Sequence, residues 1–259
     1  MTSDGGSAGP SRREPFGGAS TRGSTAAMKA TRHGEHLVQL SRLGVSNAYL
    51  VREDDGLTVV DTSLTGSAKG ILAAAGAQGA PIRRIAITHA HADHTGSLDA
   101  LHDAVPDAEV LVGERDARFL AGDRSLDPGE PQGRIFGPFY ERVGTRPTRT
   151  LRPGDRAGSL EAIAAPGHTP GQLAFLDSRD GTLLCGDAYL ALGGVFVTTQ
   201  PVARFPFPAL LGTWHKPTAH ETAVRLRALD PARLATGHGR VVDAPGPAMD
   251  AALAAAPRA

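Results

Sequence analysis

One short run of this sequence constrains the fold more than any other feature. Residues 88–96 read T-H-A-H-A-D-H-T-G, so four metal-ligand types stand within six residues: His89, His91, Asp93 and His94. Neighbours on one face of a helix recur at i, i+3 and i+4, and this spacing does not match that pattern. The run directly follows the apolar segment Ile82–Thr88, which we interpret as a buried strand. We therefore predict that the four side chains converge from the loop that leaves this strand.

Imidazole and carboxylate groups are the ligands that suit zinc and related divalent metals. Ala90 and Ala92 separate the polar residues and are small enough to leave room for that convergence. The alternative is a set of unrelated polar residues on a surface loop. Since only 10 of the 259 residues are histidine, the pattern has a chance frequency of roughly one in a thousand for such a chain. The sequence thus predicts a metal site.

Composition excludes several classes of partner. The chain is 41% hydrophobic and 21% charged, which is typical of a globular protein. Lys+Arg and Asp+Glu each total 27, so the formal charge is zero. A neutral chain with no basic block lacks the electrostatic features of proteins that bind nucleic acid or an anionic membrane surface. We expect a small-molecule substrate and a monomer or homodimer.

Targeting and redox features also narrow the choice. Cys185 is the only cysteine, which excludes an internal disulfide, and its apolar context indicates a core thiol. No apolar run approaches the roughly 18–20 residues needed to span a bilayer. Residues 1–27 contain no Leu, Ile or Val, and therefore no apolar core of a secretory signal. We expect a cytoplasmic protein.

Changes in amino-acid composition along the chain indicate the domain organisation. Residues 1–30 are rich in Gly, Ser, Ala and Arg and predict a disordered leader or a cloning remnant; residues 31–259 form one domain. We expect strands at His36–Leu40, Asn47–Val51, Leu57–Asp61, Ile82–Thr88, Glu109–Val112, Leu160–Ala164, Gln172–Leu176, Thr182–Gly186 and Arg233–Thr236. We expect helices at Ser67–Ala77, Ser97–Ala104, Glu114–Leu120, Ala219–Leu229 and 248–256. The order strands, helix, strands, helix runs twice, which suggests two α/β halves stacked face to face.

Four further residues sit at strand ends beside small residues: Asp61, His168 in APGHTPG, Asp187 in LLCGD and His238 in ATGHG. With H-x-H-x-D-H, these resemble in order the metal-binding motifs of the metallo-β-lactamase superfamily, over about residues 36–245. The resemblance implies an α/β fold, a four-layer αββα sandwich. It also implies two metals, the first held by His89, His91 and His168 and the second by Asp93, His94 and His238. Asp187 would bridge the metals, and Asp61 would orient the ligand loop.

The implied reaction is hydrolysis by a metal-bridging hydroxide, available at neutral pH because coordination lowers the pKa of water to about 7. Asp93 and Asp187 would be catalytic, with Asp93 accepting the hydroxide proton. We expect two Zn²⁺ ions, with Mn²⁺ or Fe²⁺ as alternatives. The substrate would be a small ester, thioester or lactone, as in hydrolases that resemble glyoxalase II.

Departures from subfamily patterns bear on the alternatives. Common β-lactamases of this superfamily have Arg at the position of His94 and Cys at that of Asp187, so β-lactam hydrolysis is disfavoured. Acyl-homoserine lactonases have Tyr where this chain has Leu190. Only 21 residues follow His238, too few for the helical glutathione-binding domain of glyoxalase II. A sulfur dioxygenase with one iron is the oxidoreductase alternative, but it leaves the second site unused.

The substrate pocket is less constrained. Two irregular segments, 121–147 and Leu190–Trp214, hold an aromatic cluster: Phe136, Phe139, Tyr140, Phe205, Phe207 and Trp214. These aromatics predict either a substrate wall or lid, or simple anchors of the loops to the core. Weak pocket candidates are Tyr140, Tyr189, Trp214 and His215, and Arg134 and Arg204 are candidates to meet a substrate carboxylate.

Overall fold

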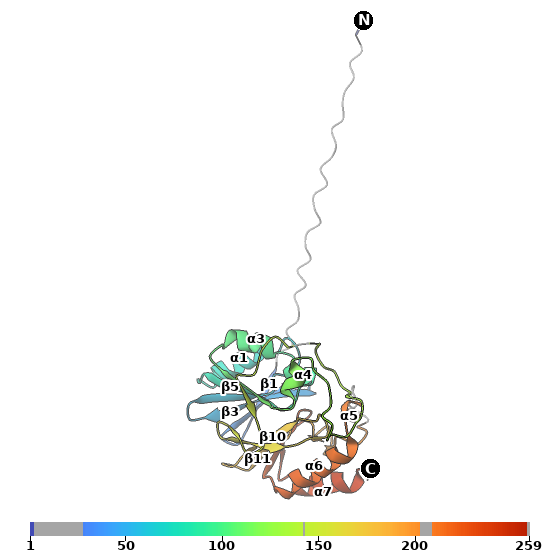
Figure 1. The fold of residues 1–259 in the computed structure, drawn as a ribbon. Helices are drawn as coiled ribbons and strands as arrows, with labels where there is room; N and C mark the ends of the chain where they lie inside the picture. Colours follow the sequence, from blue (N-terminus) through green and yellow to red (C-terminus); the bar gives the residue numbers. More distant parts are fainter. Residues whose placement is uncertain (3–27, 142, 203–208, 258–259) are drawn as a thin grey trace.

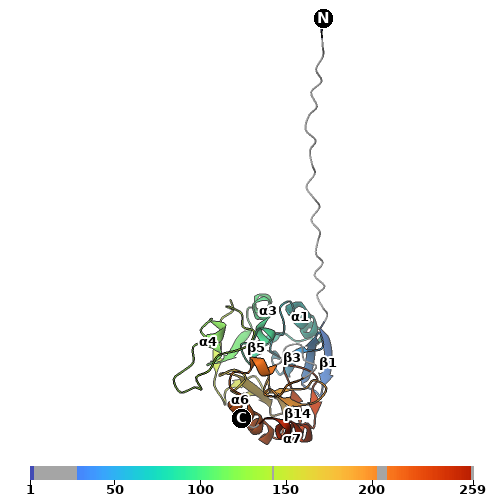
Figure 2. The ribbon, with the colours of Figure 1, turned by 90° about the vertical axis from the view of Figure 1, so that its right-hand side faces the viewer.

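The computed structural model of the chain describes residues 1–2, 28–141, 143–202 and 209–257. Two β-sheets lie face to face between two layers of helices (Figure 1). Helices α1 (Ala68–Ala77) and α3 (Leu98–Ala104) cover one side, and α6 (Lys216–Ala228) and α7 (Gly246–Ala255) cover the other. The same order of layers is visible after a turn of 90° (Figure 2). The predicted four-layer αββα sandwich is therefore confirmed.

The first sheet has seven strands in sequence order, antiparallel from β1 to β4 and parallel from β4 to β7. They are β1 (Lys29–His33), β2 (Leu37–Arg42), β3 (Ser46–Glu53), β4 (Gly56–Val60), β5 (Ile82–Ile87), β6 (Glu109–Gly113) and β7 (Arg149–Leu151). Two single-turn helices accompany this half, α2 (Ala92–Thr95) and α4 (Ala117–Leu120).

The second sheet has six strands in the order β15-β14-β11-β10-β9-β8. They are β8 (Arg156–Ala157), β9 (Leu160–Ala164), β10 (Leu173–Asp177), β11 (Thr182–Leu184), β14 (Arg233–Ala235) and β15 (Val242–Asp243). A separate pair, β12 (Tyr189–Leu190) and β13 (Phe196–Val197), and the short helix α5 (Ala209–Gly212) complete the described elements.

The buried apolar side chains form three layers: one between the two sheets and one between each sheet and its helices. Successive residues of a strand point to opposite faces. In β4, Val59 packs toward the first helical layer, whereas Val60 packs between the sheets. In the second sheet, Phe175 faces the inter-sheet core and Ala174 faces the layer of α6 and α7. The central strands are buried on both faces, so they are almost continuously apolar and need helices on both outer sides.

The strand directions place the loops that carry the candidate ligands at one edge of the sandwich. Strands β4 and β5 are parallel, so their carboxyl ends lie side by side. In the second sheet β11 and β14 are parallel, and β9 runs the same way because β10 is antiparallel to both β9 and β11. The two edges meet where the Leu173 N–H donates to the Thr88 carbonyl at 2.9 Å. Loops that follow five strands therefore surround one place.

Several expected elements differ from the structure. The ligand run was predicted as loop throughout, but Ala92–Thr95 forms the single-turn helix α2. The helix expected at Ala219–Leu229 begins earlier, at Lys216, because His215 caps its N-terminus and Pro217 suits its first turn. The sequence pattern gave no sign of β1, β7 and β8, which are short or mostly exposed strands with little apolar alternation.

The predicted leader lies mostly outside the described residues, and Lys29 and Ala30, at its predicted end, already pair with β2. Of the helices in the described ranges, none has the length and apolar character to cross a membrane.

Candidate metal centre

Four loops carry the predicted ligands, each following a strand of one of the two sheets. His89 and His91 follow β5, and His168 follows β9. Asp187 follows β11 and His238 follows β14, while Asp93 and His94 lie on α2. All seven side chains converge at the edge where the sheets meet, in three overlapping groups within which the ligand atoms lie 4.8 Å or less apart.

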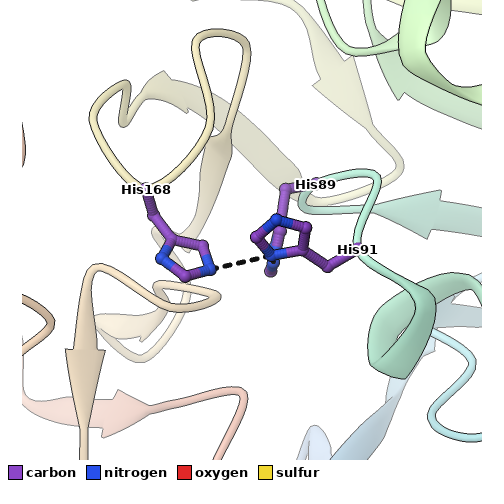
Figure 3. Close-up of side chains that lie close together, drawn as sticks. All are labelled: His89, His91 and His168. Carbon is purple, nitrogen blue, oxygen red and sulfur yellow. Dashed lines mark hydrogen bonds between the residues drawn. The ribbon is translucent and has the colours of Figure 1, made fainter. Parts of the chain in front are cut away.

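The first group consists of three buried imidazoles (Figure 3). His91 Nδ1 lies 3.1 Å from His89 Nε2 and 2.9 Å from His168 Nε2. The close-up shows His168 approaching from its own loop, opposite the loop that carries His89 and His91. Three ring nitrogens from two sheets thus face one point, which is the ligand set of a histidine-rich metal site.

Partners on the outer ring nitrogens orient all three imidazoles, and His168 Nδ1 lies 3.1 Å from the Thr213 hydroxyl oxygen. For His89 and His91 the partner also fixes which nitrogen carries the proton. His91 Nε2 faces the Phe136 carbonyl at 3.1 Å, and since a carbonyl only accepts, His91 is protonated at Nε2. The Thr88 hydroxyl donates to Asp61 and so accepts from His89 Nδ1. Each ring therefore presents an unprotonated nitrogen inward, as metal coordination requires.

The second group is acidic as well as imidazole-rich. His94 Nε2 lies 3.3 Å from Asp187 Oδ1, and His238 Nε2 lies 3.1 Å from Asp187 Oδ2. His238 Nε2 is also 3.3 Å from Asp93 Oδ2. On the outer side His238 Nδ1 donates to the Val45 carbonyl at 2.9 Å, which again turns Nε2 inward. This group therefore resembles the mixed His/Asp ligand sets that hold zinc and related cations.

Asp187 stands between the two groups. Its Oδ2 atom is 3.5 Å from His168 Nε2 of the first group and 3.1 Å from His238 Nε2 of the second. His94 Nε2 and Asp187 Oδ1 are both buried and lie 3.3 Å apart, but neither makes a well-aligned hydrogen bond in the described part of the chain. A buried polar atom without a partner is costly, and a cation between these two atoms would satisfy both. The residues of these groups therefore fit divalent metal.

Burial and charge set the protonation of the two groups differently. Burial lowers the pKa of His91 to about 4 and that of His168 to about 3. Burial also disfavours the charged form of His238, but the carboxylates of Asp187 and Asp93 outweigh it and raise its pKa to about 10. The first group thus holds neutral imidazoles, whereas the second pairs protonated histidine with carboxylates when no metal is bound.

A sequence profile of the metallo-beta-lactamase superfamily matches residues 41–238, most of the chain. The chain belongs to this superfamily. It is 45% identical over 207 residues to the uncharacterized protein YobT of Bacillus subtilis (strain 168), in an alignment that covers 80% of this chain and 88% of YobT. It is 30% identical over 200 residues to a hydroxyacylglutathione hydrolase of Xanthomonas axonopodis pv. citri (strain 306), covering 72% of this chain and 66% of that protein.

Among solved structures, the crystal structure of TTHA1623 in a di-iron-bound form is similar, with a TM-score of 0.57 and 26% sequence identity. The match covers 78% of this chain and 91% of that one. The metal named for that neighbour is iron.

Sequence reasoning missed one buried acidic residue at this superfamily site. Asp116 is fully buried and accepts hydrogen bonds from the loops that carry the three-histidine group. Burial raises the pKa of its carboxyl to about 6. Its signal in the sequence was its place just after β6, since Asp61 and Asp187 also follow strands.

The four candidate pocket residues differ in how close they lie to the ligand loops. Tyr189 is fully buried, and its hydroxyl donates to the Ala223 carbonyl at 2.7 Å, so it does not reach the metal ligands. Tyr140 is partly exposed and bonds to Thr65. His215 accepts from the Thr218 backbone N–H as the cap of α6. Trp214 is 9% exposed, and its backbone N–H donates to the His168 carbonyl, which places it beside a ligand loop.

The long segment after α4 lies against the site. The Phe139 ring packs on His91 with centroids 4.6 Å apart, and the Ala92 N–H donates to the Pro138 carbonyl. The Arg134 guanidinium stacks over the Phe136 ring, at 5.5 Å from the ring centroid. Phe205, Phe207 and Arg204 lie outside the described residues.

Proposed function

We propose that this protein is a binuclear metallohydrolase that cleaves an ester, thioester or lactone bond of a small molecule. The observation that carries the proposal is the position of the Asp187 carboxylate, which faces histidines of both ligand groups. A mononuclear enzyme would have no use for Asp93, His94 and His238 in a second converging group. We propose Zn²⁺ as the metal, with Mn²⁺ or Fe²⁺ as alternatives.

When bound, two divalent cations would supply Lewis acidity and lower the pKa of a water molecule from 15.7 to about 7. The chain supplies the rest. His89, His91 and His168 would hold one cation, Asp93, His94 and His238 the other, and Asp187 would contact both. Because Asp187 and all five of these histidines are buried, the site excludes bulk water and strengthens electrostatic stabilisation of the reacting carbonyl.

Asp93 differs from the other ligands in its exposure. Its side chain is 23% exposed, whereas those of His94, His238 and Asp187 are 3% exposed or less. The His238 imidazole outweighs the cost of burial and keeps the pKa of the Asp93 carboxyl well below its usual range, so the group is ionised at neutral pH. We propose that an Asp93 carboxylate oxygen accepts a proton during cleavage, since this ligand alone among the seven is partly exposed.

The relatives favour acyl substrates. Hydroxyacylglutathione hydrolase, by its name, hydrolyses a hydroxyacyl conjugate of glutathione, and this chain is 30% identical to it over 200 residues. In this chain the second ligand group contains both His94 and Asp187. A set of oxygen and nitrogen ligands without thiolate disfavours the β-lactamase alternative, whose common members carry Cys at the Asp187 position.

The test is metal content and activity on the same protein. Protein purified without added metal should contain about two metal ions per chain by mass spectrometry and should hydrolyse members of a thioester, ester and lactone panel. Asp187→Ala should lose metal and activity together. Asp250→Ala, which removes an exposed carboxylate far from the ligands, should change neither. One iron per chain with an empty second group would sink the binuclear hydrolase and favour the sulfur dioxygenase alternative.

A further inference from the structure

The buried carboxylate of Asp116 joins the two loops that carry the three-histidine group. Its Oδ2 atom accepts hydrogen bonds from the Ala90 N–H at 3.0 Å and from the Thr169 hydroxyl at 2.8 Å. Its Oδ1 atom accepts from the Gly171 N–H at 2.8 Å. The side chain is fully buried, so no water competes for these three donors.

The donors stand next to the ligands. Ala90 lies between His89 and His91 in the loop after β5, and Thr169 directly follows His168 in the loop after β9. Strands β5 and β9 belong to different sheets. One carboxylate therefore fixes how close the His89/His91 loop lies to the His168 loop.

The fit around Asp116 leaves little freedom. A Cβ added at Gly171 would lie 2.6 Å from Asp116 Oδ1 and 2.7 Å from Arg115 Cβ, so only glycine permits this approach. A Cβ at Gly113 would lie 2.7 Å from the Gly171 carbonyl oxygen. The segment from β6 to α4 thus packs backbone to backbone against the His168 loop.

We infer that Asp116 is a positioning residue that sets the separation of the two ligand loops and so the geometry of the three-histidine group. The inference rests on the proposed metal site. Asp116 makes no contact with a ligand side chain and acts through backbone and hydroxyl donors. An ionised carboxylate only accepts hydrogen bonds. An amide in its place would direct its own N–H group at one or more of the Ala90 N–H, the Thr169 hydroxyl and the Gly171 N–H, which are themselves donors.

The second ligand group is oriented by other residues. Asp61 accepts from His94, and the Val45 carbonyl accepts from His238. Loss of the Asp116 carboxylate should therefore weaken one metal and not both. A residue that merely stabilises the fold would not produce this selectivity.

The chain offers a matched control for stability. Glu53 is also a buried carboxylate that joins the two sheets, with Oε1 accepting from the Thr58 hydroxyl at 3.0 Å and Oε2 from the Ser159 N–H at 3.0 Å. Neither of these donors adjoins a metal ligand. Glu53 also lies 3.7 Å from Arg179, and Glu53→Gln thus removes a buried carboxylate charge from an inter-sheet contact that involves no ligand loop.

The experiment is a competition titration of the metal-loaded, full-length protein with a chromophoric chelator of known affinity, together with thermal unfolding of each variant. In Asp116→Asn we expect one of the two metal equivalents to bind 10–100-fold more weakly, a range typical when a group that orients a ligand is removed. Glu53→Gln should lower the unfolding temperature and leave both affinities unchanged. Thr169→Val, which removes one donor and keeps the carboxylate, should weaken the same equivalent by a smaller factor and serves if Asp116→Asn does not fold.

The inference would be overturned if Asp116→Asn bound both metal equivalents as tightly as the wild-type protein does. It would also be overturned if Asp116→Asn and Glu53→Gln each weakened both metal equivalents to the same extent. If the wild-type protein itself binds no second equivalent, the proposed function fails instead, and the two failures are thereby distinguished.

Discussion

His94 Nδ1 lies 2.7 Å from Asp61 Oδ2, and this contact directs the other nitrogen of His94 toward Asp187. The same carboxylate accepts from the Thr88 N–H and hydroxyl, and Thr88 in turn contacts His89. Asp61 is held at a φ of 58°, a left-handed conformation that costs energy for a residue other than glycine. One strained residue therefore orients ligands of both groups.

Asp61→Asn should weaken metal binding by 10–100-fold, because the amide cannot accept from His94 and from both Thr88 donors at once. The measurement is chelator competition at pH 7. Asp55→Asn is the control, since Asp55 is an exposed carboxylate that pairs with Arg84 at the surface. An unchanged affinity in Asp61→Asn would show that packing alone holds His94.

Metal binding should release protons from one group only. The pKa values of about 4 for His91 and about 3 for His168 leave the first group unprotonated at pH 7.5, with nothing to release. His238 has a raised pKa of about 10 and is protonated at that pH, so a cation must displace its proton. The affinity of the second group should therefore rise with pH up to about 10, while that of the first stays flat from pH 6 to 9.

Calorimetric titration of the metal-free protein in two buffers of different ionisation enthalpy measures these protons. We expect at least one proton released with one equivalent and none with the other. Proton release that is equal for the two equivalents would contradict the difference in pKa.

Gly137→Ala should disturb the first group from outside. Gly137 has a φ of 115°, and an added Cβ would collide with the His91 ring. Either the loop or His91 must move, which removes the contact between His91 and the Phe136 carbonyl. We expect weaker binding of one metal equivalent and a lower kcat. Gly129→Ala in the same segment meets no atom within 4 Å and should behave as the wild-type protein does.

Phe175→Ala should destabilise the fold by about 3–5 kcal/mol, the usual cost of removing a buried aromatic ring. Phe175 is fully buried between the sheets with Leu111 and Leu184. Urea unfolding at a fixed metal concentration measures the change. Val224→Ala, at a position on α6 that is 46% exposed, should change the free energy of unfolding by less than about 1 kcal/mol.

Local sequence was enough to predict much of the fold. The apolar strands β3, β4, β5 and β6 and the Ala-rich helix α1 were expected within a few residues of their observed bounds, because burial imposes an apolar pattern on the chain itself. The short strands β7 and β8 carry mostly exposed side chains and left no such pattern. The α2 turn was missed because its four residues are too few for a helical period to show.

The sequence by itself determined the candidate metal ligands by type and position: a dense His/Asp run after a strand, and single His or Asp residues after three others. It determined no distance between them. His168 and His91 are 77 positions apart, and only the packing of two sheets brings their nitrogens to 2.9 Å. The roles of Asp116 and of the Phe136 and Val45 carbonyls were decided by tertiary structure alone, because a backbone carbonyl or a lone aspartate has no signature until folding places it against a ligand loop.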